Sequence, residues 1–277
     1  MIKKRILKLR KLLNFYNLDG YIIPKNDAYF SEYSEPDRLK IISNFSGSAG
    51  LAVILKQKNY LFVDGRYTIQ AKNESGKEFK IVEIPKYSYA STLNKFKKKL
   101  CLGFDPQLFT NFSIKNKFKG HFKLVPVEEN LIDKLSTKKK DKRIITKFYN
   151  LKSNITGEKM NSKINKLVRE IQSQKIDNIF ISAPENVAWL LNIRGRDNPN
   201  SPIPNCKLIL TKNKKMYFFS CPKKISKIKK IGEYKNLKFC EYKDFFKVID
   251  SLNGKNFCID KISCSISNEN IIRSFFK

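Results

Sequence analysis

The chain has 277 residues and a mass of 32.3 kDa, a length that allows two ordinary domains or one large one. Hydrophobic residues make up 41% and aromatic residues 12%, which excludes disordered and collagen-like classes. No run of apolar residues approaches the roughly 20 needed to cross a bilayer. The first residues lack the uninterrupted apolar core of a signal peptide.

The charge is strongly basic, with 56 Lys and Arg against 25 Asp and Glu and a net charge of +31. Such a field attracts nucleic acid or anionic membranes. However, the excess is mostly lysine and is spread along the whole chain. A protein that binds nucleic-acid phosphates specifically concentrates arginine and aromatic residues on one face. We interpret the charge as a composition bias and predict no specific nucleic-acid partner and no membrane partner.

Six cysteines form no C-x-x-C pair and accompany no secretion signal, so we predict free thiols in the reducing cytoplasm. His121 is the one histidine, and a zinc site of the usual kinds cannot be built without more histidines or paired cysteines. We interpret His121 as a loop residue beside a strand. No metal ligand is predicted in this chain.

Hydrophobic periodicity predicts alternating helices and strands in the first half. Apolar residues at steps of three and four indicate a helix over 2–18, and a short strand follows at 21–23. Two β-rich runs, 51–55 and 60–63, indicate a hairpin. The remaining elements are a helix at 66–72, a strand at 80–84, a helix at 88–99, a strand at 101–104, a helix at 109–118 and a strand at 122–125.

The second half repeats this order. A helix over 157–174 is expected to have Thr156 as its N-cap, and a strand follows at 178–182. Pro184 suits the first turn of a helix that runs to about Asn192. The remaining elements are a hairpin at 207–210 and 216–219, a helix, a strand at 237–241, a helix at 243–252, a strand at 256–260 and a last helix from about Ser267.

This repetition predicts an α/β fold of two tandem domains, 1–146 and 147–277, each a mixed sheet flanked by helices. The charged stretch 134–155 is the expected linker. The second copy stops at Lys277 inside its last helix, before any strand equivalent to 122–125. We therefore expect the second domain to be truncated and the polypeptide to be a piece of a longer protein.

Two glycine-containing motifs have competing interpretations. Gly47-Ser48-Ala49-Gly50 precedes a strand, which is the wrong order for a phosphate-binding loop or a nucleophile elbow. We interpret it as a tight turn whose glycines allow positive φ and close packing. Asp64-Gly65-Arg66 is either a turn with a surface ion pair or a device that projects the Arg66 guanidinium toward a peptide carbonyl or carboxylate. The residues alone favour the turn.

Trp189 is the one tryptophan and lies in a mostly apolar helix, which indicates a place in the core. The charged loop 194–197 beyond it either lines a cleft between the domains or is solvated.

Taken together, several motifs resemble the long, three-domain Xaa-Pro aminopeptidases (aminopeptidase P) of the creatinase/prolidase metallopeptidase superfamily. They fall in the order and spacing of that family and cover nearly the whole chain. They are Asp27-Ala28, Ser31-Glu32-Tyr33, Phe45 with Gly47-Ser48-Ala49-Gly50, Asp64-Gly65-Arg66-Tyr67 with Gln70-Ala71, Gly103-Phe104-Asp105-Pro106, Val125-Pro126-Val127 with Glu129-Asn130-Leu131-Ile132-Asp133, and Asn186-Val187-Ala188-Trp189-Leu190-Leu191-Asn192-Ile193-Arg194-Gly195 with Asp197.

This resemblance implies two tandem creatinase N-terminal domains followed by a catalytic pita-bread domain that the chain lacks. In the family that third domain holds two divalent metal ions, manganese or zinc, so no cofactor and no catalytic residue is expected in this piece. We predict that the chain is the N-terminal, noncatalytic part of a metal-dependent enzyme that removes the residue preceding proline from short peptides. It would shape the active-site cleft and the oligomer, and the piece alone would be inactive.

The partners implied by the resemblance are short proline-containing peptides, the chain's own catalytic domain and a second copy in a homodimer, in the cytoplasm. The resemblance also implies that Arg66 contacts substrate, and we expect Asp64 and Tyr67 to support it. Two departures from the family pattern are Ser46, where an acidic residue is common, and the segment 200–205. Creatinase and prolidase have only one such N-terminal domain. The alternatives are a stand-alone peptide- or protein-binding module and a basic nucleic-acid-binding protein.

Overall fold

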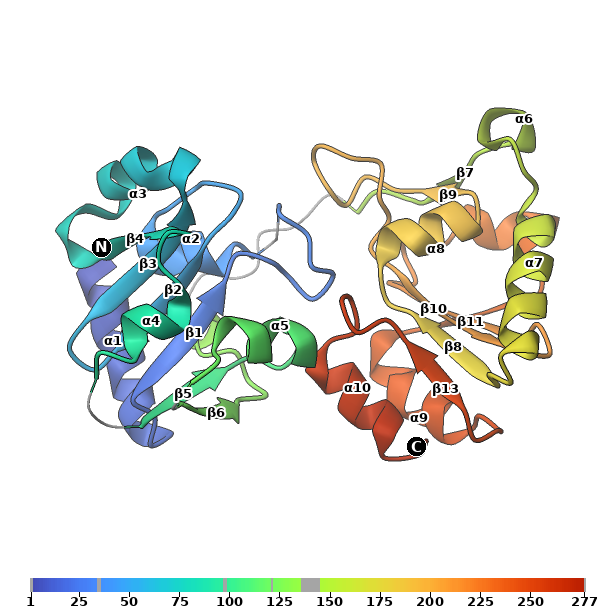
Figure 1. Cartoon of the computed structure of the whole chain (residues 1–277). Helices are drawn as coiled ribbons and strands as arrows, with labels where there is room; N and C mark the ends of the chain where they lie inside the picture. Colours follow the sequence, from blue (N-terminus) through green and yellow to red (C-terminus); the bar gives the residue numbers. More distant parts are fainter. Residues whose placement is uncertain (1, 34–35, 97–98, 121, 136–144, 277) are drawn as a thin grey trace. The chain divides into compact units, whose positions relative to one another are not determined.

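The computed structural model describes residues 2–33, 36–96, 99–120, 122–135 and 145–276. His121 and residues 136–144 of the predicted linker lie outside these ranges. The chain forms two compact units, Met1–Asp141 and Lys142–Lys277 (Figure 1). The unit boundary thus comes shortly before the domain boundary that the sequence predicts after residue 146.

Unit 1 is a six-stranded mixed sheet with helices on both faces. The sheet order is β4-β3-β2-β1-β5-β6, in which β1–β2 and β2–β3 are antiparallel and the other pairs are parallel. The elements in chain order are α1 (Ile2–Phe15), β1 (Gly20–Pro24), α2 (Arg38–Ser43), β2 (Leu51–Leu55), β3 (Asn59–Asp64), α3 (Thr68–Ser75), β4 (Lys80–Ile84), α4 (Tyr89–Leu93), β5 (Leu100–Phe104), α5 (Asn111–Lys117) and β6 (Phe122–Pro126).

Alternation along the strands divides the apolar residues of unit 1 between two layers. Leu61 and Val63 of β3 join a core with α1, α2 and α3 on one face. Phe62 points to the other face, where its ring lies 4.8 Å from that of Tyr89 in α4. The mixed sheet flanked by helices is therefore as predicted from the periodicity.

Unit 2 repeats this plan with a five-stranded sheet in the order β12-β11-β10-β8-β13. Its elements are β7 (Tyr149–Asn150), α6 (Ser153–Thr156), α7 (Met160–Ser173), β8 (Asn178–Ile181), α8 (Pro184–Leu190), β9 (Ile193–Arg194), β10 (Lys207–Thr211), β11 (Met216–Phe219), β12 (Leu237–Cys240), α9 (Phe245–Asp250), β13 (Phe257–Ile259) and α10 (Ile266–Arg273). Residues of α7 and α8 share one core with Leu208 and Phe218, while Ile209 and Phe219 pack with α9 and α10 on the opposite face.

Several sequence predictions need correction in unit 2. Thr156 is not the N-cap of the long helix, because it ends the short α6, and Lys159 stands before α7 without a side-chain cap. Between β11 and β12 the chain forms two 3₁₀ turns instead of an α-helix. The last helix ends at Arg273, so the prediction that the chain stops within it is wrong. Within the described part of the second sheet, β6 has no counterpart beside β13.

Candidate functional site

Arg66 lies where β3 ends and the chain turns into α3. Asp64 closes the strand and accepts a hydrogen bond from the backbone N–H of Arg66 at 3.0 Å, which starts a 3₁₀ turn over Gly65–Tyr67. The turn lies beside β4, since a Cβ at Gly65 would lie 3.3 Å from Oε1 of Glu83. The Asp-Gly-Arg sequence is therefore a turn, as its composition predicts.

The Arg66 side chain is held by its own turn. Its Nε donates to Oδ1 of Asp64 at 2.8 Å and its Nη2 donates to Oδ2 at 3.4 Å. This hydrogen bonding lowers the pKa of Asp64 and raises the pKa of Arg66. The Arg66 side chain remains 76% exposed, so its guanidinium is oriented by Asp64 and accessible to a peptide carboxylate or carbonyl.

Tyr67 links this turn to the glycine loop 47–50. Its hydroxyl lies 3.0 Å from Oγ of Ser48, and its ring packs edge-on against the buried Phe45. The guanidinium of Arg66 lies 5.6 Å from the Tyr67 ring centroid. The structure thus brings together the three residues singled out in the sequence, Asp64, Arg66 and Tyr67. It adds Ser48, which the sequence places in a tight turn without indicating its contact with Tyr67.

Ser46 makes a second link between the same loop and α3. Its backbone N–H and its hydroxyl donate to the carboxylate of Glu74 at 2.7 and 2.6 Å. Gln70 donates to both partners at 3.0 Å. The serine at this departure from the family pattern therefore serves as a hydrogen-bonding partner of α3.

The glycines of the loop 47–50 provide close packing but not the predicted positive φ, which neither adopts. A Cβ on Gly47 would lie 2.3 Å from the ring of Phe45. A Cβ on Gly50 would lie 3.1 Å from Leu39. The prediction of left-handed glycines is wrong here because close approach of the ring alone requires the missing side chain.

Both units carry a similar contact after the helix that follows the first strand of their main sheet, α2 after β1 and α8 after β8. Asn44 follows α2 and Asn192 follows α8, each with a left-handed backbone, φ 65° and 54°. Arg5 of α1 donates to Oδ1 of Asn44 at 2.5 Å, and Lys163 of α7 donates to Oδ1 of Asn192 at 2.7 Å. The duplication thus extends to side chains that fix the loops following these helices.

Trp189 differs from its sequence prediction. It is 59% exposed, with the ammonium of the buried Lys163 4.4 Å from its ring centroid. Lys163 also donates to the carbonyl oxygen of Trp189 at 2.7 Å. The inward positions of α8 are filled by smaller apolar residues, Val187, Ala188 and Leu190, so the ring lies on the outer side.

The charged loop 194–197 is not simply solvated. The Asp197 side chain is only 7% exposed and pairs with Lys224 at 2.5 Å. It also accepts the backbone N–H of Asn205 at 2.7 Å, and Arg194 donates to the carbonyl oxygens of Ala188 and Ile193. These contacts fix the loop within unit 2.

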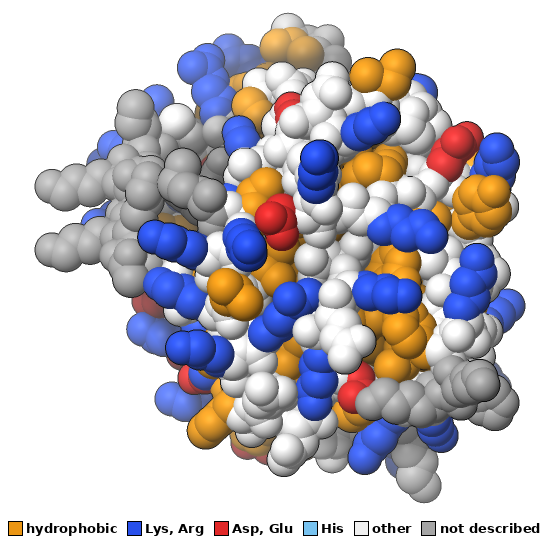
Figure 2. All heavy atoms as spheres, turned by 90° about the vertical axis from the view of Figure 1, so that its left-hand side faces the viewer, with side chains coloured by type: hydrophobic (Ala, Val, Ile, Leu, Met, Phe, Trp, Pro, Cys, Tyr) orange, Lys and Arg blue, Asp and Glu red, His pale blue; other side chains and the backbone are white. Residues whose placement is uncertain are grey.

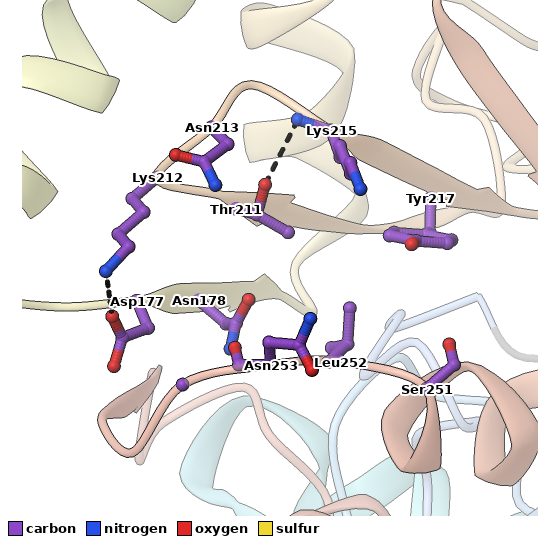
Figure 3. A pocket seen from close by; sticks show the side chains of 11 residues that line it. Asp177, Asn178, Thr211, Lys212, Asn213, Lys215, Tyr217, Ser251, Leu252 and Asn253 are labelled. Carbon is purple, nitrogen blue, oxygen red and sulfur yellow. Dashed lines mark hydrogen bonds and ion pairs between the residues drawn. The ribbon is translucent and has the colours of Figure 1, made fainter.

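A pocket of about 130 Å³ lies at the amino end of β8 (Figure 3). Asp177 and Lys212 form an ion pair at 2.7 Å on its rim, and Asn178 donates to the carbonyl oxygen of Asn253. The Thr211 hydroxyl accepts the backbone N–H of Lys215 at 3.1 Å, as Figure 3 shows. These polar groups bind one another, and ligands of α/β sheets usually bind at the opposite, carboxyl ends of the strands.

Metal ligands and membrane spans were sought in the described ranges. There, no three His, Cys, Asp or Glu side chains come together in a group able to hold a metal ion. No helix in the same ranges is long and apolar enough to cross a membrane.

Comparisons with known proteins point to one family for both units. A family model described as the creatinase/prolidase N-terminal domain matches residues 5–135, and a second model with the same description matches residues 138–274. Xaa-Pro aminopeptidase 1 of Dictyostelium discoideum is 34% identical over 230 residues, which cover 73% of this chain and 35% of that protein. A probable Xaa-Pro aminopeptidase P of Pyricularia oryzae is 32% identical over 211 residues, which cover 72% and 34%.

A solved structure agrees with these matches. The X-prolyl aminopeptidase of Caenorhabditis elegans, described as a cytosolic enzyme with a di-nuclear active site, matches 90% of this chain and 44% of its own with a TM-score of 0.81 and 25% identity. The chain spans about a third of the length of the two sequence relatives. Both of its halves belong to the creatinase/prolidase N-terminal domain family, and the pair is homologous to the N-terminal part of Xaa-Pro aminopeptidase P.

Proposed function

We propose that the chain is the N-terminal, noncatalytic part of a metal-dependent Xaa-Pro aminopeptidase. Two tandem domains of one family, matched over most of their length by Xaa-Pro aminopeptidases, support this proposal. In the complete enzyme they would shape the cleft that admits short proline-containing peptides and contribute to oligomer contacts. The catalytic pita-bread domain, with its two manganese or zinc ions, would supply the metal-bound nucleophile.

Arg66 is the residue of this chain that we expect to contact the substrate. Its guanidinium is exposed, yet it is held in a fixed direction by Asp64 and lies over the ring of Tyr67. A pre-oriented fork of N–H donors matches a peptide carboxylate or carbonyl with little loss of side-chain entropy on binding. Asp64 and Tyr67 would act as positioning residues.

Two measurements test this proposal. The purified 277-residue chain should show no hydrolysis of an Xaa-Pro tripeptide with added manganese, and hydrolysis in proportion to its concentration would refute the noncatalytic role. In a longer product of the gene that is active, Arg66→Ala should lower kcat/KM by about 10-fold or more with unchanged metal content, the loss expected for a charged contact to substrate. Arg169→Ala, at an exposed arginine of α7, is the matched control and should leave kcat/KM unchanged.

We also propose that the complete enzyme is located in the cytoplasm and forms a homodimer. The Caenorhabditis elegans relative is a cytosolic enzyme, which supports the cytoplasmic location. Light scattering of the active product would test the dimer. A stand-alone peptide-binding module would instead be indicated if no longer product of the gene exists and the 277-residue chain binds proline-containing peptides.

The distribution of charge disfavours a dedicated nucleic-acid binder. Figure 2 shows lysine and arginine side chains dispersed over one face of unit 1, with apolar side chains between them. Dispersed charge gives weak binding with a steep salt dependence and no sequence preference. Tight RNA binding that survives moderate salt would favour that alternative instead.

A further inference from the structure

The outer edge of β4 is an open strand edge in unit 1. β4 pairs in parallel with β3 on one side, and no strand of the described residues pairs with its other side. Alternate residues of such a strand direct their backbone N–H and C=O groups away from the sheet. This edge therefore offers a template for a further strand.

A groove of about 470 Å³ runs beside this edge, between two helices that cover opposite faces of the sheet. Thr68 and Lys72 line it from α3, and Thr92 lines it from α4. Ile81 and Val82 of β4 contribute apolar surface. An extended peptide backbone in this groove would lie along β4 with its side chains directed toward α3 and α4 in turn.

The groove carries a clear charge preference. Lys72, Lys80 and Lys95 line it, and all three are exposed. Glu83 is the one carboxylate among the lining residues, and its Oε1 is turned toward Gly65. A second copy of the chain would bring the same three lysines against these, and a lysine on a strand edge, such as Lys80 of β4, opposes such self-pairing. Charge complementarity thus favours an acidic partner.

We propose that the β4 edge groove binds an extended acidic peptide segment as an additional strand. The peptide backbone pairs with the open edge of β4, and its Asp or Glu side chains pair with Lys72, Lys80 and Lys95. This is recognition by strand addition, in which main-chain hydrogen bonds provide affinity and side chains provide selectivity. The site is independent of the substrate contact proposed for Arg66.

A labelled peptide of alternating Asp and Thr or Val tests the proposal by fluorescence anisotropy with the 277-residue chain. Binding should slow hydrogen exchange of those amides within Lys80–Ile84 that are directed away from β3. Two further versions of the peptide are N-methylated on alternate residues, one version for each edge of the extended peptide. Methylation keeps every charge but blocks strand pairing along that edge. The version methylated on the edge that pairs with β4 should bind at least about 10-fold more weakly. Equal binding by versions methylated on either edge, or no protection of β4, would overturn the proposal.

Charge-reversal variants test the role of the lysines. The triple variant Lys72→Glu, Lys80→Glu and Lys95→Glu should bind the peptide at least about 10-fold more weakly. The control, Lys4→Glu, Lys8→Glu and Lys11→Glu, makes the same charge change at exposed positions of α1. Equal weakening by both would mean diffuse attraction only. A concentration-dependent dimer that protects β4 without peptide would show self-pairing, and either result would refute the acidic partner.

Discussion

Asp19 and Asp177 hold equivalent places in the two units. Each directly precedes the first strand of its main sheet, β1 or β8. Its carboxylate accepts backbone N–H groups from the neighbouring parallel strand segment: Cys101 in unit 1, and Lys255 and Asn256 in unit 2. Each also accepts, through its carbonyl oxygen, the N–H of the residue after the antiparallel neighbour, Lys56 or Lys212. One aspartate thus joins three strands at the amino end of each sheet.

Replacing Asp177 by asparagine tests the energetic weight of this junction. The carboxylate accepts N–H bonds at 2.7 and 3.0 Å and pairs with Lys212, so Asp177→Asn should destabilise unit 2 by about 1–3 kcal/mol at pH 7. Trp189 lies in unit 2 and is the one tryptophan of the chain, so urea unfolding followed by its fluorescence reports this unit. The exposed Asp250, replaced by asparagine, is the control.

The free energy of unfolding that Asp177 contributes should depend on pH. The backbone bonds from Asn256 and Lys255 and the pair with Lys212 hold the pKa of Asp177 far below its usual range. The carboxylate therefore stabilises the fold fully above about pH 5, and the contribution is lost as pH falls through the unfolded value of about 4 toward the native one. The stability difference between wild type and Asp177→Asn should shrink from pH 7 to pH 3. A constant difference would contradict this assignment.

The elements that the sequence predicts well are those with strong periodicity. The strands 51–55, 80–84 and 216–219 have the predicted bounds, and the other main strands differ by one residue at one or both ends. Alternating or continuous β-branched and aromatic runs carry that information locally. By contrast, α2 has only six residues and depends on Asp37, which caps it by accepting the N–H of Lys40. Short helices of this kind lack a readable period.

The features that the sequence does not predict depend on contacts between distant residues. Asp64 is two positions from Arg66, so their pairing is readable as a turn. The partner of Tyr67, Ser48, is 19 positions away, and the partner of Lys163, Asn192, is 29 away. The sequence predicts a place in the core for Trp189 because its neighbours on the helix are mostly apolar, and this prediction is wrong. Only tertiary packing shows that smaller residues fill the inner face of α8.

Removing the Lys163 ammonium should destabilise unit 2. Lys163 is 3% exposed, and its Nζ serves both the carbonyl oxygen of Trp189 and Oδ1 of Asn192. Lys163→Met keeps the aliphatic stem but leaves both acceptors without this donor, which costs about 1–3 kcal/mol. The emission of Trp189 should also change because the cation leaves its ring. Arg169→Met, on the exposed face of the same helix, should change neither property.

The Tyr67–Ser48 hydrogen bond should couple the glycine loop to the turn that carries Arg66. Tyr67→Phe and Ser48→Ala each remove one partner at a distance of 3.0 Å. In a double-mutant cycle the two changes should be non-additive by about 0.5–1.5 kcal/mol, the usual value of one hydrogen bond. Hydrogen exchange of the amides in 44–50 and 65–70 measures this, because Trp189 does not report on unit 1. Additive effects would mean that the two hydroxyls act separately.

Gly195→Ala should destabilise unit 2 by overpacking. A Cβ at this position would lie 2.7 Å from the backbone Cα of Pro204 and 3.1 Å from the ring of Phe148, so the loop after β9 must move. Overpacking of this kind costs about 1–3 kcal/mol. Gly232→Ala is the matched control, since a Cβ there meets nothing within 4 Å. Urea unfolding followed by Trp189 fluorescence should show a lowered midpoint for Gly195→Ala alone, and equal midpoints would mean that the loop adjusts freely.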